Sequence, residues 1–223
     1  GSSKLWSVKR EKRVGSGEAD KACYLLLGEL VPAYRGVEFN IAEKVMGAII
    51  AAAYGRKAKE VLRRYRARGD LGDVAYDLAA KTRSPRSRST VGRVYDRMLE
   101  IAAEAGAGSQ TRRISRFAEL MAGLDPLAAK YAARIPVGKL RLGFSEATIL
   151  DALSVMVAGD KSARPEIEAA YNVTADIGAI AERIKSSGLA GLARLGAKPG
   201  VPIRPSLAER LRTTAEVITK IGP

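Results

Sequence analysis

The chain has 223 residues, contains no histidine, and has Cys23 as its single cysteine. Without an imidazole, Ser-His-Asp and Cys-His nucleophiles, histidine-ligated zinc and histidine proton relays are excluded for this chain. One cysteine also excludes an internal disulfide framework and a thiolate metal cage. Chemistry within the chain is therefore left to carboxylates, lysines, hydroxyls and backbone groups.

Long hydrophobic runs and amide side chains are scarce as well. The longest apolar stretch, around residues 48–54, is far shorter than the ~18 to 20 residues of a membrane span, and no basic-then-apolar leader precedes it. We therefore expect no membrane partner and a cytoplasmic location, associated with the nucleoid if the source is prokaryotic. Asparagine and glutamine together number three, Asn40, Gln110 and Asn172, which favours a thermophilic source.

Positive charge and apolar residues are abundant. The chain has 38 Lys+Arg against 24 Asp+Glu, a formal net charge of +14, and a sequence pI of about 10.1. Such an excess indicates a polyanionic partner. With 47% hydrophobic residues and this length, the chain can form one large domain or two small ones with a packed core.

Apolar residues recur at helical spacing along most of the chain, whereas strand-like alternation is confined to residues 137–142. Ser145 and the pair Asp125-Pro126 stand where helices should begin, and glycines stand where helices should end. The sequence predicts an all-α fold of about ten to twelve helices. The predicted stripes are Ile41, Val45, Ile49 and Ala52; Ile114, Phe117, Ala118 and Met121; Ile149, Leu150, Leu153 and Val157; and Ile177, Ile180, Ala181 and Ile184.

Two basic stretches have alternative interpretations. Residues 56–66 are best explained as a solvated helix face. In residues 81–90, Arg83, Arg86 and Arg88 alternate with hydroxyl residues and a proline. Guanidinium groups and hydroxyls on a loop can bind phosphates, but a linker with incidental charge explains the same pattern equally well.

A third basic stretch, residues 138–148, combines several features of a phosphate contact. In an extended turn Lys139 and Arg141 would project to one side and Leu140 and Leu142 to the other, so that the leucines anchor the loop. Gly138 and Gly143 bracket these four residues, and a helix is expected to begin at Ser145 and expose N–H groups to an anion. The alternative is a tight interhelical turn with surface charges.

Acidic residues offer one candidate for metal-dependent chemistry. Asp70, Asp73 and Asp77 have a spacing that can place them on one helix side, as a nuclease or phosphotransferase would need. Helix caps and surface ion pairs explain such acids far more often. We therefore predict no metal site and no catalytic residue.

Several segments form a recognisable series along the chain: Tyr24 to Pro32, Gly69 to Ala75, Gly138-Lys139-Leu140-Arg141-Leu142-Gly143 with Ser145-Glu146-Ala147-Thr148, Ala170 to Asn172 with Asp176 to Gly178, and Pro199 to Ala208. Together they resemble the N-terminal DNA-binding domain of archaeal and eukaryotic-type ATP-dependent DNA ligases. Order and spacing agree over roughly residues 20–210. The resemblance implies a helical domain over residues 20–200. Residues 1–19, which open on a tag-like Gly-Ser-Ser, would form a shortened N-terminal segment, and residues 201–223 a linker toward a nucleotidyltransferase domain.

The resemblance also implies a function and a set of contact residues. A domain of this family binds nicked double-stranded DNA through the minor groove and phosphates, irrespective of base sequence, while the nucleotidyltransferase and OB domains, with ATP and Mg²⁺, seal the nick. No Lys-x-Asp-Gly nucleophile motif occurs in this chain, so we expect it to be inactive by itself and to need no cofactor. A sliding clamp is a further possible partner of the parent protein. The expected DNA contacts are Gly138, Lys139, Leu140, Arg141, Leu142, Gly143, Ser145, Glu146, Ala147 and Thr148, together with Arg83, Arg86, Arg88, Arg112 and Arg113.

One alternative keeps the affinity for DNA without the ligase parentage. A helical transcription regulator would place a recognition helix in the major groove and would discriminate between base sequences. Competition with random DNA distinguishes the two, because a ligase domain is indifferent to sequence.

Overall fold

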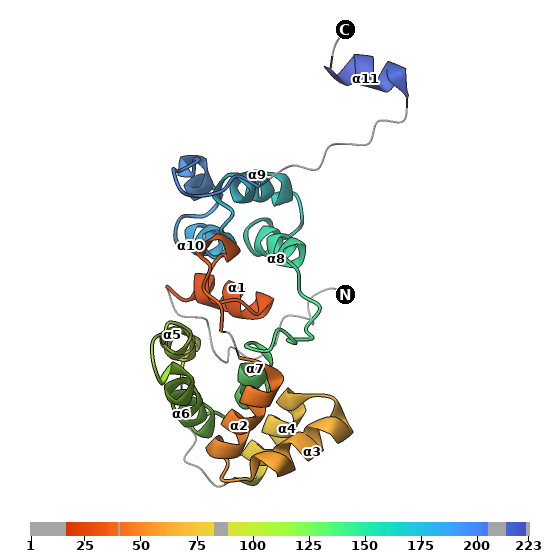
Figure 1. Cartoon of the computed structure of the whole chain (residues 1–223). Helices are drawn as coiled ribbons and strands as arrows, with labels where there is room; N and C mark the ends of the chain where they lie inside the picture. The colour runs from red at the N-terminus through yellow and green to blue at the C-terminus, as the bar shows by residue number, and fades with distance from the viewer. Residues whose placement is uncertain (1–16, 40, 83–88, 205–212, 222–223) are drawn as a thin grey trace, which may run out of the picture.

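The computed structural model of the chain describes residues 17–39, 41–82, 89–204 and 213–221. These residues form eleven α-helices and two 3-10 helices and no strand, which confirms the all-α prediction (Figure 1). The candidate strand at residues 137–142 is an irregular loop. The helices are α1 (Ala19–Leu27), η1 (Ala33–Arg35), α2 (Glu43–Ala53), α3 (Ala58–Arg68), α4 (Leu71–Lys81), α5 (Val91–Ala102), α6 (Ser109–Ala122), α7 (Pro126–Arg134), α8 (Glu146–Ala158), α9 (Arg164–Thr174), α10 (Ile177–Ser187), η2 (Leu189–Arg194) and α11 (Thr214–Ile221).

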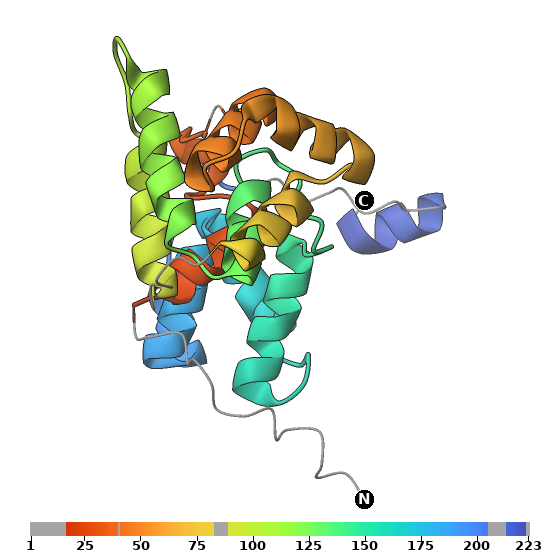
Figure 2. The same ribbon diagram turned by 90° about the horizontal axis from the view of Figure 1, so that it is seen from below.

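The helices form two lobes, each with its own hydrophobic core. Helices α2 to α7 enclose the first core, in which Met46, Ile49 and Phe117 have no exposed surface. Helices α8, α9 and α10 with η2 enclose the second, around Ile167 and Ile180. Figure 1 shows α1 between the two lobes, although it precedes both in the chain, and Figures 1 and 2 show α11 apart from them.

Helix α1 joins the lobes through two adjacent residues. Cys23 packs into the second core and Tyr24 into the first. The Tyr24 hydroxyl donates a buried hydrogen bond of 2.5 Å to Asp176, whose carboxylate also accepts the Ala179 N–H and so caps α10. A Cβ atom on Gly178 would lie 2.3 Å from Cζ of Tyr24, so α10 can approach α1 this closely only because residue 178 lacks a side chain.

The predicted helix boundaries are largely confirmed. Asp125 caps α7 with Pro126 in its first turn, and Ser145 caps α8. Three of the four predicted stripes face a core, but Ala52 of the first stripe is exposed and Ile41 precedes α2. The prediction for Ala52 was wrong because the buried face of α2 is centred on Met46, Ile49 and Ile50, and Ala52 lies outside that face.

The chain after residue 200 remains attached to the second lobe for at least four residues. The Arg204 N–H donates to the Asn172 carbonyl at 2.8 Å. Its guanidinium lies 2.8 Å from a carboxylate oxygen of Glu146 and 4.6 Å from the ring centroid of Tyr171. The first part of the predicted linker therefore lies on α8 and α9.

Candidate nucleic-acid interface

The loop that joins α7 to α8 brings the predicted contact residues to the surface between the lobes. Gly138, Arg141 and Gly143 have positive φ angles of 66°, 55° and 68°, so the loop is not the extended turn that the sequence predicted. Lys139 and Arg141 are nevertheless exposed, while Leu140 and Leu142 are half-buried and Leu140 packs against the first core. The leucines anchor the loop and the cations face solvent.

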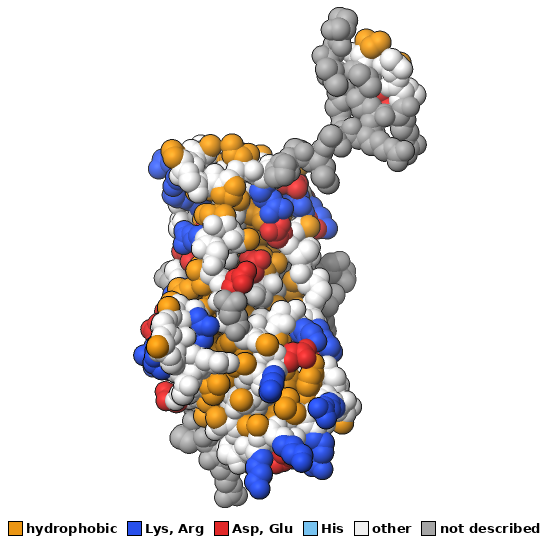
Figure 3. Space-filling model, viewed as in Figure 1, with side chains coloured by type: hydrophobic (Ala, Val, Ile, Leu, Met, Phe, Trp, Pro, Cys, Tyr) orange, Lys and Arg blue, Asp and Glu red, His pale blue; other side chains and the backbone are white. Residues whose placement is uncertain are grey.

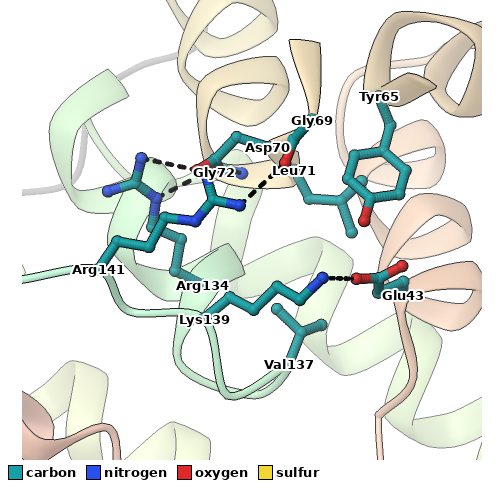
Figure 4. A pocket seen from close by; sticks show the side chains of 10 residues that line it. All are labelled: Glu43, Tyr65, Gly69, Asp70, Leu71, Gly72, Arg134, Val137, Lys139 and Arg141. Atoms are coloured by element: carbon teal, nitrogen blue, oxygen red, sulfur yellow. Dashed lines mark hydrogen bonds and ion pairs between the residues drawn. The ribbon is translucent and has the colours of Figure 1, made fainter. Parts of the chain in front are cut away.

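Lys139 reaches across to the first residue of α2. Its ammonium forms an ion pair with the carboxylate of Glu43, 96 positions earlier in the chain (Figure 4). The hydrogen bond from Lys139, followed by that from the Tyr65 hydroxyl, lowers the pKa of Glu43, and the same pairing raises the pKa of Lys139. The Lys139 side chain remains 48% exposed.

Lys139, Glu43 and Tyr65 line one side of a small pocket, and Arg141 is held on the other side by Asp70 and Gly69. Its Nη1 lies 3.2 Å from Oδ2 of Asp70, and its Nη2 donates to the Gly69 carbonyl at 3.2 Å (Figure 4). The Arg141 side chain is 52% exposed, whereas that of Asp70 is 5% exposed. Arg141 therefore pairs with a buried carboxylate while about half of its own side chain stays exposed to solvent.

Asp70 is the buried acceptor that holds the groups around this pocket together. It caps α4 by accepting the N–H groups of Gly72 and Asp73 at 2.7 and 3.1 Å. It also accepts both Nε and Nη2 of Arg134 at 3.2 and 2.9 Å. Burial opposes ionisation, but the hydrogen bonds from Arg134 and the two N–H groups outweigh it, and the pKa of Asp70 lies below its ordinary value. Because the Arg134 carbonyl accepts the Lys139 N–H, the same arginine fixes the start of the loop.

The sequence interpretation missed the acidic partners of the loop. It expected Lys139 and Arg141 to project unopposed, whereas the structure pairs one with Glu43 and the other with Asp70. Asp70 lies in the segment Gly69 to Ala75, but the sequence predicted only a helix cap, a surface ion pair or a metal ligand for it. No local pattern indicates Glu43, because the contact depends on how α2 packs beside the loop.

The N-terminus of α8 is closed by a capping box. The Thr148 N–H donates to Oγ of Ser145 at 3.2 Å, and the Ser145 N–H donates to Oγ1 of Thr148 at 3.3 Å. This cap uses the N–H of Thr148, the third residue of α8. The N–H groups of Glu146 and Ala147, the first two residues, are not used by the cap. The Glu146 carboxylate contacts Arg204 and the Tyr171 hydroxyl, so it anchors the exit segment, which the sequence did not predict.

Arg112 and Arg113 are not part of this loop site. Arg112 pairs with Glu104 at 2.8 Å and donates to the carbonyls of Ala105 and Ala107. Arg113 donates to the carbonyls of Ala102 and Glu104. Both therefore hold the connection between α5 and α6. Arg83, Arg86 and Arg88 lie outside the described residues.

The three aspartates considered for metal chemistry form caps and ion pairs. Besides the contacts of Asp70, Asp73 pairs with Lys130 at 2.7 Å and Asp77 with Arg68 at 2.6 Å. Within the described ranges no group of three or more metal-ligating side chains occurs. No helix among the residues that the structure describes is long and apolar enough to cross a membrane.

Further basic side chains lie on the surface of the first lobe. Figure 3 shows lysine and arginine side chains on the lower lobe, together with a broad hydrophobic area and some acidic side chains. Helix α3 lies at the front of that lobe in the same view (Figure 1) and contributes the exposed residues Lys59, Arg63 and Arg66. The first lobe therefore has exposed cations on α3 in addition to the two cations of the loop.

Comparison with known proteins identifies the family. A family profile described as DNA ligase N terminus matches residues 5–154. The chain is 37% identical to a DNA ligase of Acidianus ambivalens over 223 residues, covering 95% of this chain and 37% of that protein. It is 40% identical to a DNA ligase of Aeropyrum pernix, covering 89% and 36%, and 38% identical to a probable DNA ligase of Aquifex aeolicus, covering 91% and 35%.

These matches decide between the two parentages that the sequence left open. The chain spans little more than a third of the length of these relatives. The family profile covers the loop, its brackets and the start of α8, and it sets aside an unrelated transcription regulator. The chain therefore belongs to the family of DNA ligase N-terminal domains.

Proposed function

We propose that this chain binds nicked double-stranded DNA through the minor groove and the phosphates, irrespective of base sequence, as the DNA-binding domain of an ATP-dependent DNA ligase. The observation that supports it most is the loop of residues 138–143. It carries two half-exposed cations on a leucine anchor, directly before the capped start of α8, in a chain of the ligase family.

The geometry suits a backbone contact better than base recognition. Lys139 is a point charge with three donors, and Arg141 has donors beyond those used by Asp70 and Gly69. The N–H groups at the start of α8 add a partial positive charge beside them. These groups recognise phosphate oxygens, which carry no sequence information.

The sealing chemistry belongs to the rest of the parent protein. Nick sealing in this family requires a nucleophilic lysine, ATP and a divalent metal, and no Lys-x-Asp-Gly motif is present in this chain. We propose that the domain holds the DNA for the nucleotidyltransferase and OB domains in replication, repair and recombination. A sliding clamp is a further proposed partner of the parent.

Fluorescence anisotropy with a labelled nicked duplex tests the binding function. Phosphate contacts release counterions, so about six contacts should cost roughly a thousandfold in affinity between 50 and 200 mM salt. Unlabelled nicked duplex of random sequence should compete as well as unlabelled nicked duplex of the same sequence as the probe. Affinity that is unchanged by salt, or strong preference for one base sequence, would contradict the proposal.

The double variant Lys139→Ala/Arg141→Ala tests the loop as the contact. It should weaken duplex binding by about 1 to 3 kcal/mol and leave the helix content unchanged. The control is Arg194→Ala/Lys198→Ala, which removes two exposed cations from the second lobe at equal cost in net charge. Equal loss of affinity in both double variants would show that the loop is not a specific contact.

A further inference from the structure

Two acids lie beneath the loop cations, and they differ in how firmly they are held. The Asp70 side chain is 5% exposed and is bound by Arg134 and by two backbone N–H groups, in addition to Arg141. The Glu43 side chain is 38% exposed. Its carboxylate accepts hydrogen bonds from the ammonium of Lys139 and the hydroxyl of Tyr65.

This difference gives the two cations different freedom. Asp70 keeps the Arg134 guanidinium whatever Arg141 does, because the Asp70–Arg134 pair is buried. Glu43 and Lys139 meet at the surface, where water and salt screen an ion pair and its net free energy is small. The ammonium of Lys139 can therefore exchange partners at little cost.

We propose that Glu43 limits the DNA affinity of the loop by competing with a phosphate for the ammonium of Lys139. A phosphate that approaches Lys139 meets the carboxylate of Glu43 beside it, so binding requires either separation of the ion pair or close approach of two anions. Arg141 stays on Asp70 and Gly69 and offers its remaining donors. The inference rests on the proposed function and adds an affinity-determining residue, on α2, to the loop itself.

A double-mutant cycle tests the competition between Glu43 and a phosphate for Lys139. It uses the whole chain and anisotropy titrations with the nicked duplex. Glu43→Gln should tighten binding about two- to fivefold, the range expected when an exposed ion pair no longer has to be broken. Lys139→Ala should weaken binding. Glu43→Gln added to Lys139→Ala should have little further effect, because the competed cation is absent.

Two further variants separate competition from a simple change in net charge. Glu43→Asp preserves the charge but withdraws the carboxylate from Lys139, and it should tighten binding by less than Glu43→Gln. Glu100→Gln removes a more exposed acid, from the Arg97–Glu100 pair of α5, and its effect should be smaller than that of Glu43→Gln. Thermal unfolding of every variant shows whether the fold is retained.

Three results would overturn the inference, and one of them also bears on the proposed function. If Lys139→Ala weakens binding but Glu43→Gln does not tighten it, Glu43 is no competitor, although the loop still contacts DNA. If Glu43→Gln tightens binding equally with and without Lys139, the effect is long-range charge. If Lys139→Ala/Arg141→Ala leaves affinity unchanged, both this inference and the loop contact fail.

Discussion

At the scale of single residues, Asp70 connects folding to the candidate interface. It caps α4, neutralises the buried Arg134 and receives Arg141 from the loop. A buried charge whose partner is lost remains desolvated and unpaired, which costs far more than the loss of a surface pair. The position of the loop cations therefore depends on a residue that is itself almost inaccessible.

Asp70→Asn should lower the free energy of unfolding by up to about 3 to 5 kcal/mol, because it retains a capping side chain but leaves Arg134 only the partly exposed carboxylate of Asp73, at 3.5 Å, as a counter-charge. Urea denaturation at pH 7 measures the loss. Asp125→Asn, which makes the same change at the α7 cap, should cost less than about 1 kcal/mol. Similar losses in both variants would contradict this account of the Asp70–Arg134 pair.

The lowered pKa of Asp70 adds a dependence on pH. A depressed pKa contributes stability that is present above the unfolded value of about 3.9 and is lost as the pH falls through the lower folded value. The unfolding free energy of the unmodified chain should therefore fall by more than that of Asp70→Asn as the pH is lowered below about 4. Parallel pH profiles would show that Asp70 is not the responsible group.

At the scale of elements, the start of α8 has a structural role and a proposed functional role that use neighbouring groups. Ser145 and Thr148 use their hydroxyls in the capping box, so these hydroxyls already serve the helix. The N–H groups of the first turn and the helix dipole remain as the groups that can meet an anion. A test must therefore change the charge at this end without removing the cap.

Ser145→Asn and Ser145→Asp differ in charge but both provide a good N-cap. Both should unfold within about 1 kcal/mol of the unmodified chain. If a phosphate lies about 4 Å from this helix end, the aspartate should bind duplex at least about fivefold more weakly than the asparagine. Anisotropy titrations of the two variants measure the ratio, and a ratio near one would place the DNA elsewhere.

At the scale of the whole molecule, α1 connects the two lobes by packing into both hydrophobic cores. Its two neighbouring residues, Cys23 and Tyr24, belong to different cores, and the hydrogen bond from Tyr24 to Asp176 crosses the contact with α10. The loop and the start of α8 lie where the chain passes from the first lobe to the second (Figure 1). A loose contact between lobes would therefore disturb the candidate interface.

Gly178→Ala should lower the unfolding free energy by about 1 to 3 kcal/mol, because the added methyl group meets the Tyr24 ring and overpacks the contact. Hydrogen exchange should accelerate in both α1 and α10. Gly196→Ala is the control, since a Cβ atom there meets nothing within 4 Å, and it should change stability by less than about 0.5 kcal/mol. Acceleration confined to α10 would show that the lobes do not unfold together.

The sequence by itself determined the helical class, most helix boundaries, the basic character and the family, because periodicity, caps and motifs are properties of neighbouring residues. It also identified the loop with its leucine anchor and its two cations. Only the tertiary structure decided that Glu43 and Asp70 meet those cations, that Arg112 and Arg113 hold a turn, and that Arg204 binds α8. These contacts join residues of different elements, and helix packing, which no local pattern specifies, brings them together.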